Sequence, residues 1–255
     1  MYVFEISIEN KTDCKPDELA NEFEGLVSIL YKNGQIWKEC VLIQEKNAIR
    51  AHVQAYEKAS LQKKFCNIYF EQYRKKLEEL SGSKLMIRPH GKTTLHCEPC
   101  HCREHDRFIL QTSFSHNCSP ITCGSCGGAV PLYRLPYLGD EKEHYSILTW
   151  VSNYKACDHL NMNCGFGERW ATKQMSDPNS GLSKDGRELC KEIEEKTGVP
   201  TYCYLYNYRN VTREQDEQRT CPVCGKPWFQ NEDAFWAEQF RCAPCRLVSN
   251  LTFKT

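Results

Sequence analysis

The sequence predicts an α+β protein in three segments, and three observations support this prediction. Over residues 1–92 the apolar pattern switches between strand spacing and helical spacing in the order of a ferredoxin-like sandwich. Residues 93–215 are rich in cysteine and read as a mixed α/β segment. Residues 216–255 contain two Cys-x-x-Cys pairs with the spacing of a zinc ribbon.

The first segment shows the order β-α-β-β-α-β. Alternating apolar side chains mark its strands, and Leu19, Phe23 and Leu30 lie on one face of its first helix. Lys15-Pro16 marks the start of that helix. The six elements are expected at residues 2–9, 16–31, 36–44, 48–56, 61–80 and 85–88.

The middle segment combines short strands with longer helices. Two strands are expected at residues 107–114 and 201–208. A long helical stretch over residues 144–175 is interrupted near Gly165-Phe-Gly167. Ser183 is expected to cap a further helix over residues 183–196, and residues 210–218 read as a charged linker.

The two Cys-x-x-Cys pairs of the last segment predict a zinc site. Cys221, Cys224, Cys242 and Cys245 supply four thiolates, the full tetrahedral set of a structural zinc ion. The residues between the pairs suffice for two short strands that bring the second pair beside the first. Because such a site is closed, the metal is expected to fold the segment and not to catalyse a reaction.

A second zinc site is predicted in the middle segment. Cys123 and Cys126 have the same turn spacing, and residues 97–102 provide two further ligands. The three candidates for those two positions are Cys97, Cys100 and Cys102. Cys157 and Cys164 are an alternative second pair, and free cysteines packed as small apolar side chains are another alternative.

Charge and cysteine usage limit the class of protein. The formal net charge is zero, with 33 basic and 33 acidic side chains, so the chain is no polycation that would bind nucleic acid without specificity. No segment approaches the roughly 20 apolar residues of a membrane span, and the N-terminus lacks a signal-peptide pattern. The odd number of cysteines, seventeen, and the Cys-x-x-Cys pairs among them favour a reducing, cytoplasmic location.

Nucleic-acid binding is the leading functional prediction. Arg241 and Arg246 could contact phosphates while Trp228 and Trp236 stack on bases. An alternative is that these aromatic side chains form the core of the ribbon. Tyr202, Tyr204, Tyr206 and Tyr208 alternate along a predicted strand and form either a base-stacking platform or a packed sheet face.

An enzyme is the less favoured prediction. His96, Glu98, Cys123 and Cys126 resemble the His-x-Glu and Cys-x-x-Cys signature of zinc nucleobase deaminases, as a remote alternative. However, Thr122 stands where that signature has proline, and a strand-like stretch follows where a helix is needed. No dinucleotide, phosphate-loop or His-Glu-x-x-His motif is present. The chain is therefore expected to be non-enzymatic.

Taken together, these motifs resemble an uncharacterised bacterial family of zinc-ribbon-containing, nucleic-acid-binding proteins. The resemblance covers residues 100–255. Its strings are Cys123-Gly-Ser-Cys126 with Val130-Pro-Leu-Tyr-Arg-Leu-Pro136, Tyr154-Lys-Ala-Cys157-Asp158, Gly167-Glu-Arg-Trp-Ala171, Thr197-Gly-Val-Pro-Thr-Tyr202, Tyr204-Leu-Tyr-Asn-Tyr-Arg209, and the two ribbon pairs. It implies zinc at the four ribbon cysteines and no established reaction. RNA, DNA or a nucleoprotein is the expected partner, and a protein-interaction module is the alternative.

Overall fold

The computed structural model describes residues 1–37, 40–94, 97–140, 142–163, 165–231 and 234–252. The chain divides into two compact units. The first unit comprises residues 1–99, 117–119 and 130–145, and the second comprises residues 100–116, 120–129 and 146–255. None of the helices in the described part combines the length and the apolar character that crossing a bilayer requires.

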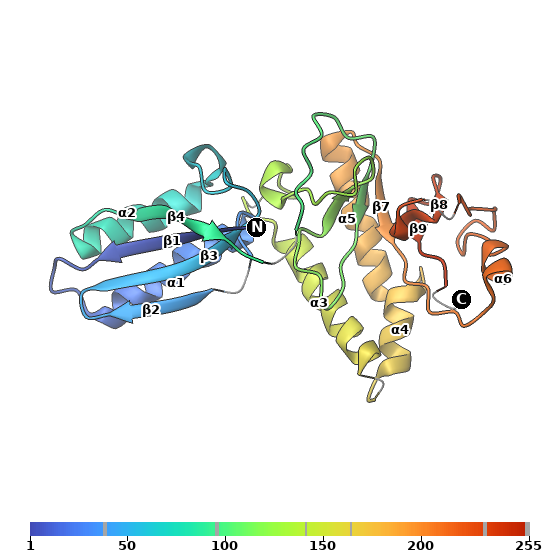
Figure 1. Cartoon of the computed structure of the whole chain (residues 1–255), viewed down its shortest axis with the longest axis horizontal. Coiled ribbons are helices and arrows are strands. Elements are labelled where there is room, and N and C mark those ends of the chain that lie inside the picture. Colours follow the sequence, from blue (N-terminus) through green and yellow to red (C-terminus); the bar gives the residue numbers. More distant parts are fainter. Residues whose placement is uncertain (38–39, 95–96, 141, 164, 232–233, 253–255) are drawn as a thin grey trace. The chain divides into compact units, whose positions relative to one another are not determined.

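The first unit contains an antiparallel four-stranded sheet in the order β2-β3-β1-β4 and two long helices (Figure 1). The elements are β1 (Tyr2–Glu9), α1 (Pro16–Lys32), β2 (Val41–Glu45), β3 (Ala48–Ala55), α2 (Ile68–Ser81) and β4 (Met86–Lys92). Their order along the chain is the β-α-β-β-α-β that the apolar pattern predicts. The two helices pack against each other and against the central strands β1 and β3.

The alternation of side chains explains why one face of this sheet is covered. On β1, Phe4, Ile6 and Ile8 are buried and join the apolar faces of α1 and α2 in one core. The opposite face is polar, and there Glu5 accepts a hydrogen bond from Arg50 Nη1 over 3.2 Å.

The central strand β3 shows the same division, with Ile49, Ala51 and Val53 buried, as expected for a sheet covered on one side. On the edge strand β2, Val41 and Ile43 lie on the uncovered face and are exposed.

The second helix is shorter than predicted. A short 3₁₀ turn, η1 (Lys63–Phe65), precedes it, and α2 begins at Ile68 because the Asn67 side chain accepts a hydrogen bond from the Phe70 N–H over 2.9 Å. It ends at Gly82, whose left-handed conformation (φ +66°) terminates the helix. The apolar pattern over residues 61–80 therefore spans two elements.

The second unit contains a five-stranded sheet in the order β6-β5-β7-β9-β8. Its central strands β5, β7 and β9 run parallel, and β6 and β8 run antiparallel at the two edges. The strands are β5 (Phe108–Leu110), β6 (Ile121–Cys123), β7 (Thr201–Tyr204), β8 (Phe240–Cys242) and β9 (Leu247–Ser249). The helices are α3 (Tyr145–Met162), α4 (Glu168–Ser176), α5 (Gly181–Thr197) and α6 (Arg213–Glu217).

The ribbon strands belong to this sheet. Strand β9 pairs in parallel with β7, and the Cys203 and Leu205 N–H groups donate to the Arg246 and Val248 carbonyls, each over 2.9 Å. Residues 216–255 are consequently part of the second unit and not a separate body. The 3₁₀ turn η3 (Trp236–Glu238) lies just before β8 and packs on β9.

Several predicted boundaries in this unit require correction. The break between α3 and α4 does fall near Gly167 (φ +78°), as predicted. Ser180 and not Ser183 caps α5, since the Ser180 Oγ accepts from the Ser183 N–H over 3.1 Å. The expected linker contains α6, which Thr212 caps together with Gln215. The predicted strands over residues 107–114 and 201–208 are limited to β5 and β7.

Candidate metal centres

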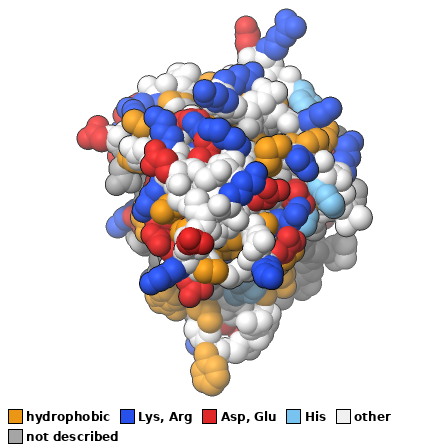
Figure 2. Space-filling model, turned by 90° about the vertical axis from the view of Figure 1, so that its left-hand side faces the viewer, with side chains coloured by type: hydrophobic (Ala, Val, Ile, Leu, Met, Phe, Trp, Pro, Cys, Tyr) orange, Lys and Arg blue, Asp and Glu red, His pale blue; other side chains and the backbone are white. Residues whose placement is uncertain are grey.

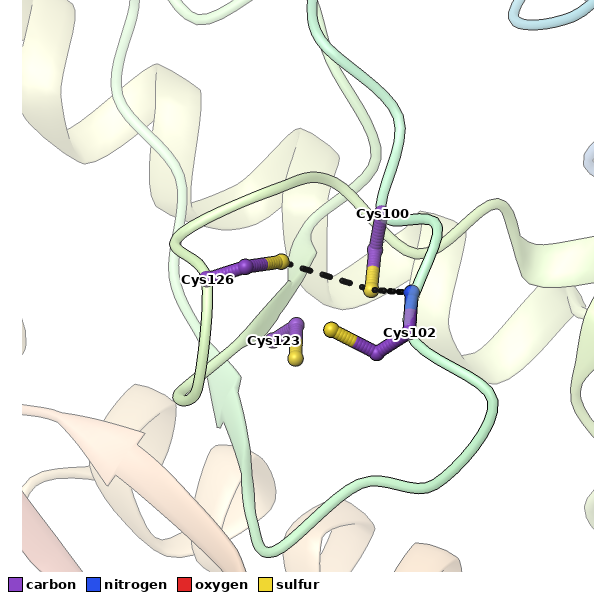
Figure 3. Close-up of side chains that lie close together, drawn as sticks. All are labelled: Cys100, Cys102, Cys123 and Cys126. Carbon is purple, nitrogen blue, oxygen red and sulfur yellow. Dashed lines mark hydrogen bonds between the residues drawn. The ribbon is translucent and has the colours of Figure 1, made fainter.

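The first group of cysteines begins in a tight turn at the end of β6. The Gly127 N–H donates to the Cys123 carbonyl over 2.8 Å, and the Cys123 N–H donates to the Gly128 carbonyl over 2.9 Å. Gly127 has φ +71°, a left-handed conformation that residues with a side chain rarely adopt. The turn brings the Sγ atoms of Cys123 and Cys126 together (Figure 3).

A second stretch of chain supplies Cys100 and Cys102, and Figure 3 shows all four side chains converging. The Cys100 N–H donates to the Ala129 carbonyl over 2.7 Å, which fixes this stretch beside the turn. Gly128 permits this approach, because a Cβ atom there would lie 2.9 Å from the Cys100 Cα. The Cys102 N–H also donates to the Cys100 Sγ over 3.3 Å, and the Gly128 N–H donates to the Cys126 Sγ over 3.4 Å.

The second group repeats this construction near the end of the chain. The Gly225 N–H donates to the Cys221 carbonyl and the Cys221 N–H donates to the Lys226 carbonyl, each over 2.9 Å, and Gly225 has φ +69°. A further turn joins β8 to β9, and there Arg246 takes the left-handed conformation with φ +52°. The cysteines brought together are Cys221, Cys224, Cys242 and Cys245.

Both groups could hold a metal ion. Within each group, all four Sγ atoms lie within 4.8 Å of one another. The Sγ atoms of Cys100 and Cys126 are 3.5 Å apart, and those of Cys224 and Cys242 are 3.6 Å apart. A tetrahedral ion with metal–sulfur bonds of about 2.3 Å places its ligands roughly 3.8 Å apart, so the spacing fits zinc. Four thiolates leave no coordination position for water or substrate.

His105 adjoins the first group, and no motif in the sequence distinguishes it from the neighbouring histidines. Its Nδ1 lies 3.4 Å from the Cys123 Sγ. Burial raises the pKa of Cys123, but the hydrogen bond with His105 and the N–H groups of Ser125 and Cys126 lower this pKa more, to about 6. A thiolate at Cys123 is therefore available near neutral pH, as metal binding requires.

The second group likewise contains one thiol with a lowered pKa, Cys224, beside a thiol with a raised pKa, Cys245. The backbone N–H of Lys226 is the main cause that lowers the pKa of Cys224, to about 7. Burial raises the pKa of Cys245, as it does for Cys100 in the first group. The thiols with raised pKa values need a neighbouring cation to ionise.

The remaining predicted ligands lie elsewhere. Cys97 forms a disulfide with Cys118 in the first unit, with their Cα atoms 5.5 Å apart, so Cys97 is no member of the four-cysteine group. Cys157 is buried in α3 and belongs to neither group among the described residues. Cys164 lies outside the described residues.

The deaminase signature finds no support in this geometry. His96 lies outside the described residues, and Glu98 is exposed. Cys123 and Cys126 lie within a set of four thiols. A zinc deaminase needs an open position on the metal for the attacking water, and a four-thiolate set provides none.

An ion pair with a buried carboxylate connects the loops of the two groups, and no sequence pattern indicates it. Arg107 donates to Glu238 through Nε over 2.7 Å and through Nη2 over 2.9 Å. Arg107 Nη2 also donates to the Gly124 carbonyl in the first turn over 2.7 Å. Glu238 is only 3% exposed and closes η3 just before the strand that bears Cys242. The pair therefore links the first turn to the ribbon.

The predicted nucleic-acid contacts are only partly accessible. Trp228 is 1% exposed and packs against Phe240 and the Arg219 guanidinium, so it is a core residue and its prediction as a base contact is wrong. Arg246 donates twice to Glu194, each time over 2.8 Å.

The other two predicted contacts reach the surface. Arg241 forms a longer ion pair of 3.8 Å with Glu238. Trp236 is half-exposed, with its ring edge-on to Tyr204.

The predicted tyrosine stripe divides into a buried and an exposed part. Tyr202 and Tyr204 lie on β7 and are buried, and Tyr204 donates to the Asn250 Oδ1 over 2.7 Å. These two rings belong to the packed sheet. Tyr208 follows the end of the strand and is exposed.

Three protein families match the chain, and all three are described as domains of unknown function. Residues 102–206 match DUF2310, residues 211–255 match DUF8594 and residues 1–91 match DUF8589. None of these descriptions mentions a zinc ribbon. Of the family resemblance predicted from the sequence, only the similarity to uncharacterised proteins is therefore confirmed.

Two solved structures show weak similarity. One is SnoaB, a cofactor-independent oxygenase from Streptomyces nogalater, at 14% identity and a TM-score of 0.30, covering 37% of this chain and 96% of that chain. The other is a conserved protein from Methanosarcina mazei at 17% identity and a TM-score of 0.29, covering 36% and 95%. These TM-scores are too low to support an argument about fold or function.

Two Haemophilus influenzae proteins, both described as uncharacterised, are closer in sequence. One is 39% identical over 149 residues, which are 57% of this chain and 71% of that protein. The other is 38% identical over 149 residues and is covered over 55% of its length. The chain belongs to the family of these Haemophilus influenzae proteins.

Proposed function

We propose that the chain is a non-catalytic binding protein in which two structural zinc ions stabilise the loops of the second unit, and that it binds nucleic acid or a nucleoprotein. The closure of both four-cysteine groups is the observation that supports a structural metal. Zinc is favoured because four sulfur ligands at these spacings suit a tetrahedral ion. The ions would hold the turns beside β6 and β8.

Nucleic acid is favoured as the partner because the ribbon carries an exposed aromatic ring and a partly exposed cation on consecutive elements, η3 and β8. Trp236 is 49% exposed and Tyr204 supports its ring edge-on, with the centroids 5.5 Å apart. Arg241 lies on the adjoining strand β8 and is one-third exposed. A base could stack on the indole while the guanidinium meets a phosphate.

The distribution of charge indicates that such binding is not driven by a large basic surface. On the face shown in Figure 2, basic and acidic side chains are interspersed with no continuous basic area. With a formal net charge of zero, few phosphates can be neutralised at once. Recognition would depend on stacking and shape.

Two further parts of the proposal concern the first unit and the location of the protein. The order β2-β3-β1-β4 supports a ferredoxin-like sandwich for residues 1–92. A cytoplasmic location is supported by the eight thiols gathered in the two metal-ligand groups, since thiolate sites persist where cysteines stay reduced. The Cys97–Cys118 disulfide is the feature that favours an oxidising environment instead.

The test is a titration of the zinc-loaded chain against labelled single-stranded RNA, single-stranded DNA and duplex at two salt concentrations. We expect binding that weakens with salt, that is lost after zinc removal and that is weakened by Trp236→Ala. Val41→Ala, which changes an exposed side chain on β2, is the control and should bind normally. The absence of binding to all three nucleic acids at low salt would refute the proposal.

A protein-interaction module is the second candidate. Four apolar side chains are exposed where α3 meets α4, a cluster that we call the hairpin tip; they are Leu160, Met162, Phe166 and Trp170. Phe166 is 97% exposed, and clustered exposed apolar side chains mark interaction sites. This candidate predicts a protein complex that survives nuclease treatment and is lost in Phe166→Ser. A complex that nuclease dissolves would contradict it.

A further inference from the structure

We propose that a groove around Tyr208 binds a single-stranded segment of nucleic acid, with one base stacked on the Tyr208 ring and phosphates held by Arg169, Lys173 and Arg209. This inference rests on the proposed function, and it places the main contact surface outside the ribbon turns. We call this surface the Tyr208 groove.

The groove consists of two adjoining depressions that share Tyr208 and Ser176. One has a volume of about 480 Å³ and lies beside the segment that follows β7, with Arg209, Gln215 and Gln218 in its wall. The other has a volume of about 630 Å³ and lies along α4. Each volume is in the range of pockets that hold small ligands, about 300–1,000 Å³, so together they could take neighbouring nucleotides.

Tyr208 is exposed on a rigid stretch of chain. The adjacent Asn207 is 4% exposed, and its side chain donates to Asp216 over 2.8 Å and to the Asn250 carbonyl over 3.1 Å. The Asn207 Oδ1 in turn accepts from the Arg209 N–H over 3.2 Å. These bonds fix the backbone on both sides of Tyr208, whose ring is nevertheless 61% exposed. An exposed ring on a fixed backbone can stack on a base at a smaller cost in backbone conformational entropy.

The cations around the groove differ from those of the ribbon. Among the described residues, Arg169, Lys173 and Arg209 form no ion pair, and all three line the groove. Arg246 in the ribbon, by contrast, is held by Glu194, and Arg219, which also lines the groove, is held by Asp216 at 3.1 Å. Cations without a carboxylate partner can meet phosphates without first breaking an internal pair.

The composition of the walls favours a single strand over a duplex or a peptide. Four cations and two carboxylates, Glu168 and Asp177, line the two depressions. Because Arg219 is paired with Asp216, three cations remain for phosphates, which gives a small positive excess suited to a few phosphates. Gln215 and Gln218 provide amide groups that can donate to and accept from the edges of unpaired bases. The bases of a duplex are already stacked and are not available to an aromatic ring.

The test measures the affinity of the full-length zinc-loaded chain for short single-stranded oligonucleotides of mixed sequence. Loss of a stacking ring costs about 1–3 kcal/mol, so Tyr208→Ala is expected to weaken binding about 5- to 150-fold. Tyr208→Phe keeps the ring and should bind normally. Tyr145→Ala is the matched control, because Tyr145 is 58% exposed and lies outside the groove.

Salt dependence tests the cations separately. Each phosphate contact contributes about 0.7 to the slope of log affinity against log salt for single strands. Lys173→Gln is therefore expected to reduce the slope by about 0.7, while Lys196→Gln, an exposed lysine at the end of α5, should leave it unchanged.

The outcomes separate this inference from the proposed function. If the wild-type chain binds and Trp236→Ala weakens binding while Tyr208→Ala does not, nucleic-acid binding stands and the groove is wrong. If the wild-type chain binds no oligonucleotide at low salt, the proposed function fails and the inference fails with it. If the chain binds no oligonucleotide but binds a peptide, and Tyr208→Ala abolishes that binding, the groove binds a peptide and the inferred ligand is wrong.

Discussion

At the scale of single residues, His144 is a buried titratable group whose surroundings do not stabilise a positive charge. The side chain is 0% exposed, and neither ring nitrogen has a hydrogen-bond partner among the residues that the structure describes. The ring lies against that of Tyr137, with centroids 4.9 Å apart. Burial lowers the pKa of His144 to about 4. The imidazole is therefore neutral in the folded first unit.

This pKa predicts acid destabilisation of the first unit. The unfolded chain takes up the proton near pH 6.5 but the folded unit only near pH 4, so the contribution of His144 to stability falls as pH drops through this window. The shift corresponds to about 3 kcal/mol. Hydrogen exchange of the β1 and β3 amides between pH 7 and pH 4 measures the loss, and His144→Phe should remove it. Equal pH dependence in wild type and variant would contradict this assignment.

At the scale of elements, local sequence predicts a turn better than it predicts which turns meet. The Cys123 and Cys221 turns follow from their spacing and from the glycine after the second cysteine. The choice of Cys100 over Cys97 does not, because it depends on the close approach of Cys100 to Gly128. The second glycine of Gly127-Gly128 is a signal that could have indicated this approach.

The same limit applies to the helices and to the ribbon aromatics. The pattern over residues 61–80 is helical throughout, yet the Asn67 cap decides where α2 begins. Trp228 and Trp236 have similar sequence surroundings, but Trp228 fills the core beside Phe240 while Trp236 lies at the surface. The burial of Trp228 depends on its contacts with Phe240 and Arg219, which the residues next to it in the sequence do not indicate.

The ligand groups give a prediction at this scale. We expect two zinc ions per purified chain, and one after either Cys126→Ser or Cys224→Ser, since each variant removes one ligand from one group. Elemental analysis measures the metal content. Both cysteines are exposed, so little packing is lost. Cys14→Ser and Cys97→Ser are the controls and should retain two ions; a loss of zinc in Cys97→Ser would return Cys97 to the ligand set.

At the scale of the whole molecule, the ribbon strands form one hydrogen-bonded sheet with β5, β6 and β7 of the second unit. The stretches 93–99, 117–119 and 130–145 of the predicted middle segment belong to the first unit instead. The β7 amides donate to carbonyls of the stretch that follows Cys245, and β5 pairs with β7 on the other side. The ion pair between Arg107 and the buried Glu238 adds a second connection. A metal at the ribbon would thus stabilise more than its own turns. The β1–β4 strands form a separate sheet in the first unit (Figure 1).

Metal removal is therefore expected to act on one unit as a whole. When a chelator strips the zinc-loaded chain, hydrogen-exchange protection should fall together at Ile109, Cys203 and Leu247, because free energy of metal binding is free energy of folding for the sheet that contains them. Protection at Ile6 and Val53 should persist, since these residues belong to the other sheet. Readdition of zinc should restore the lost protection. If exchange instead quickens only within residues 220–249, the ribbon folds separately from β5 and β7, and the single cooperative unit inferred from the strand pairing does not exist.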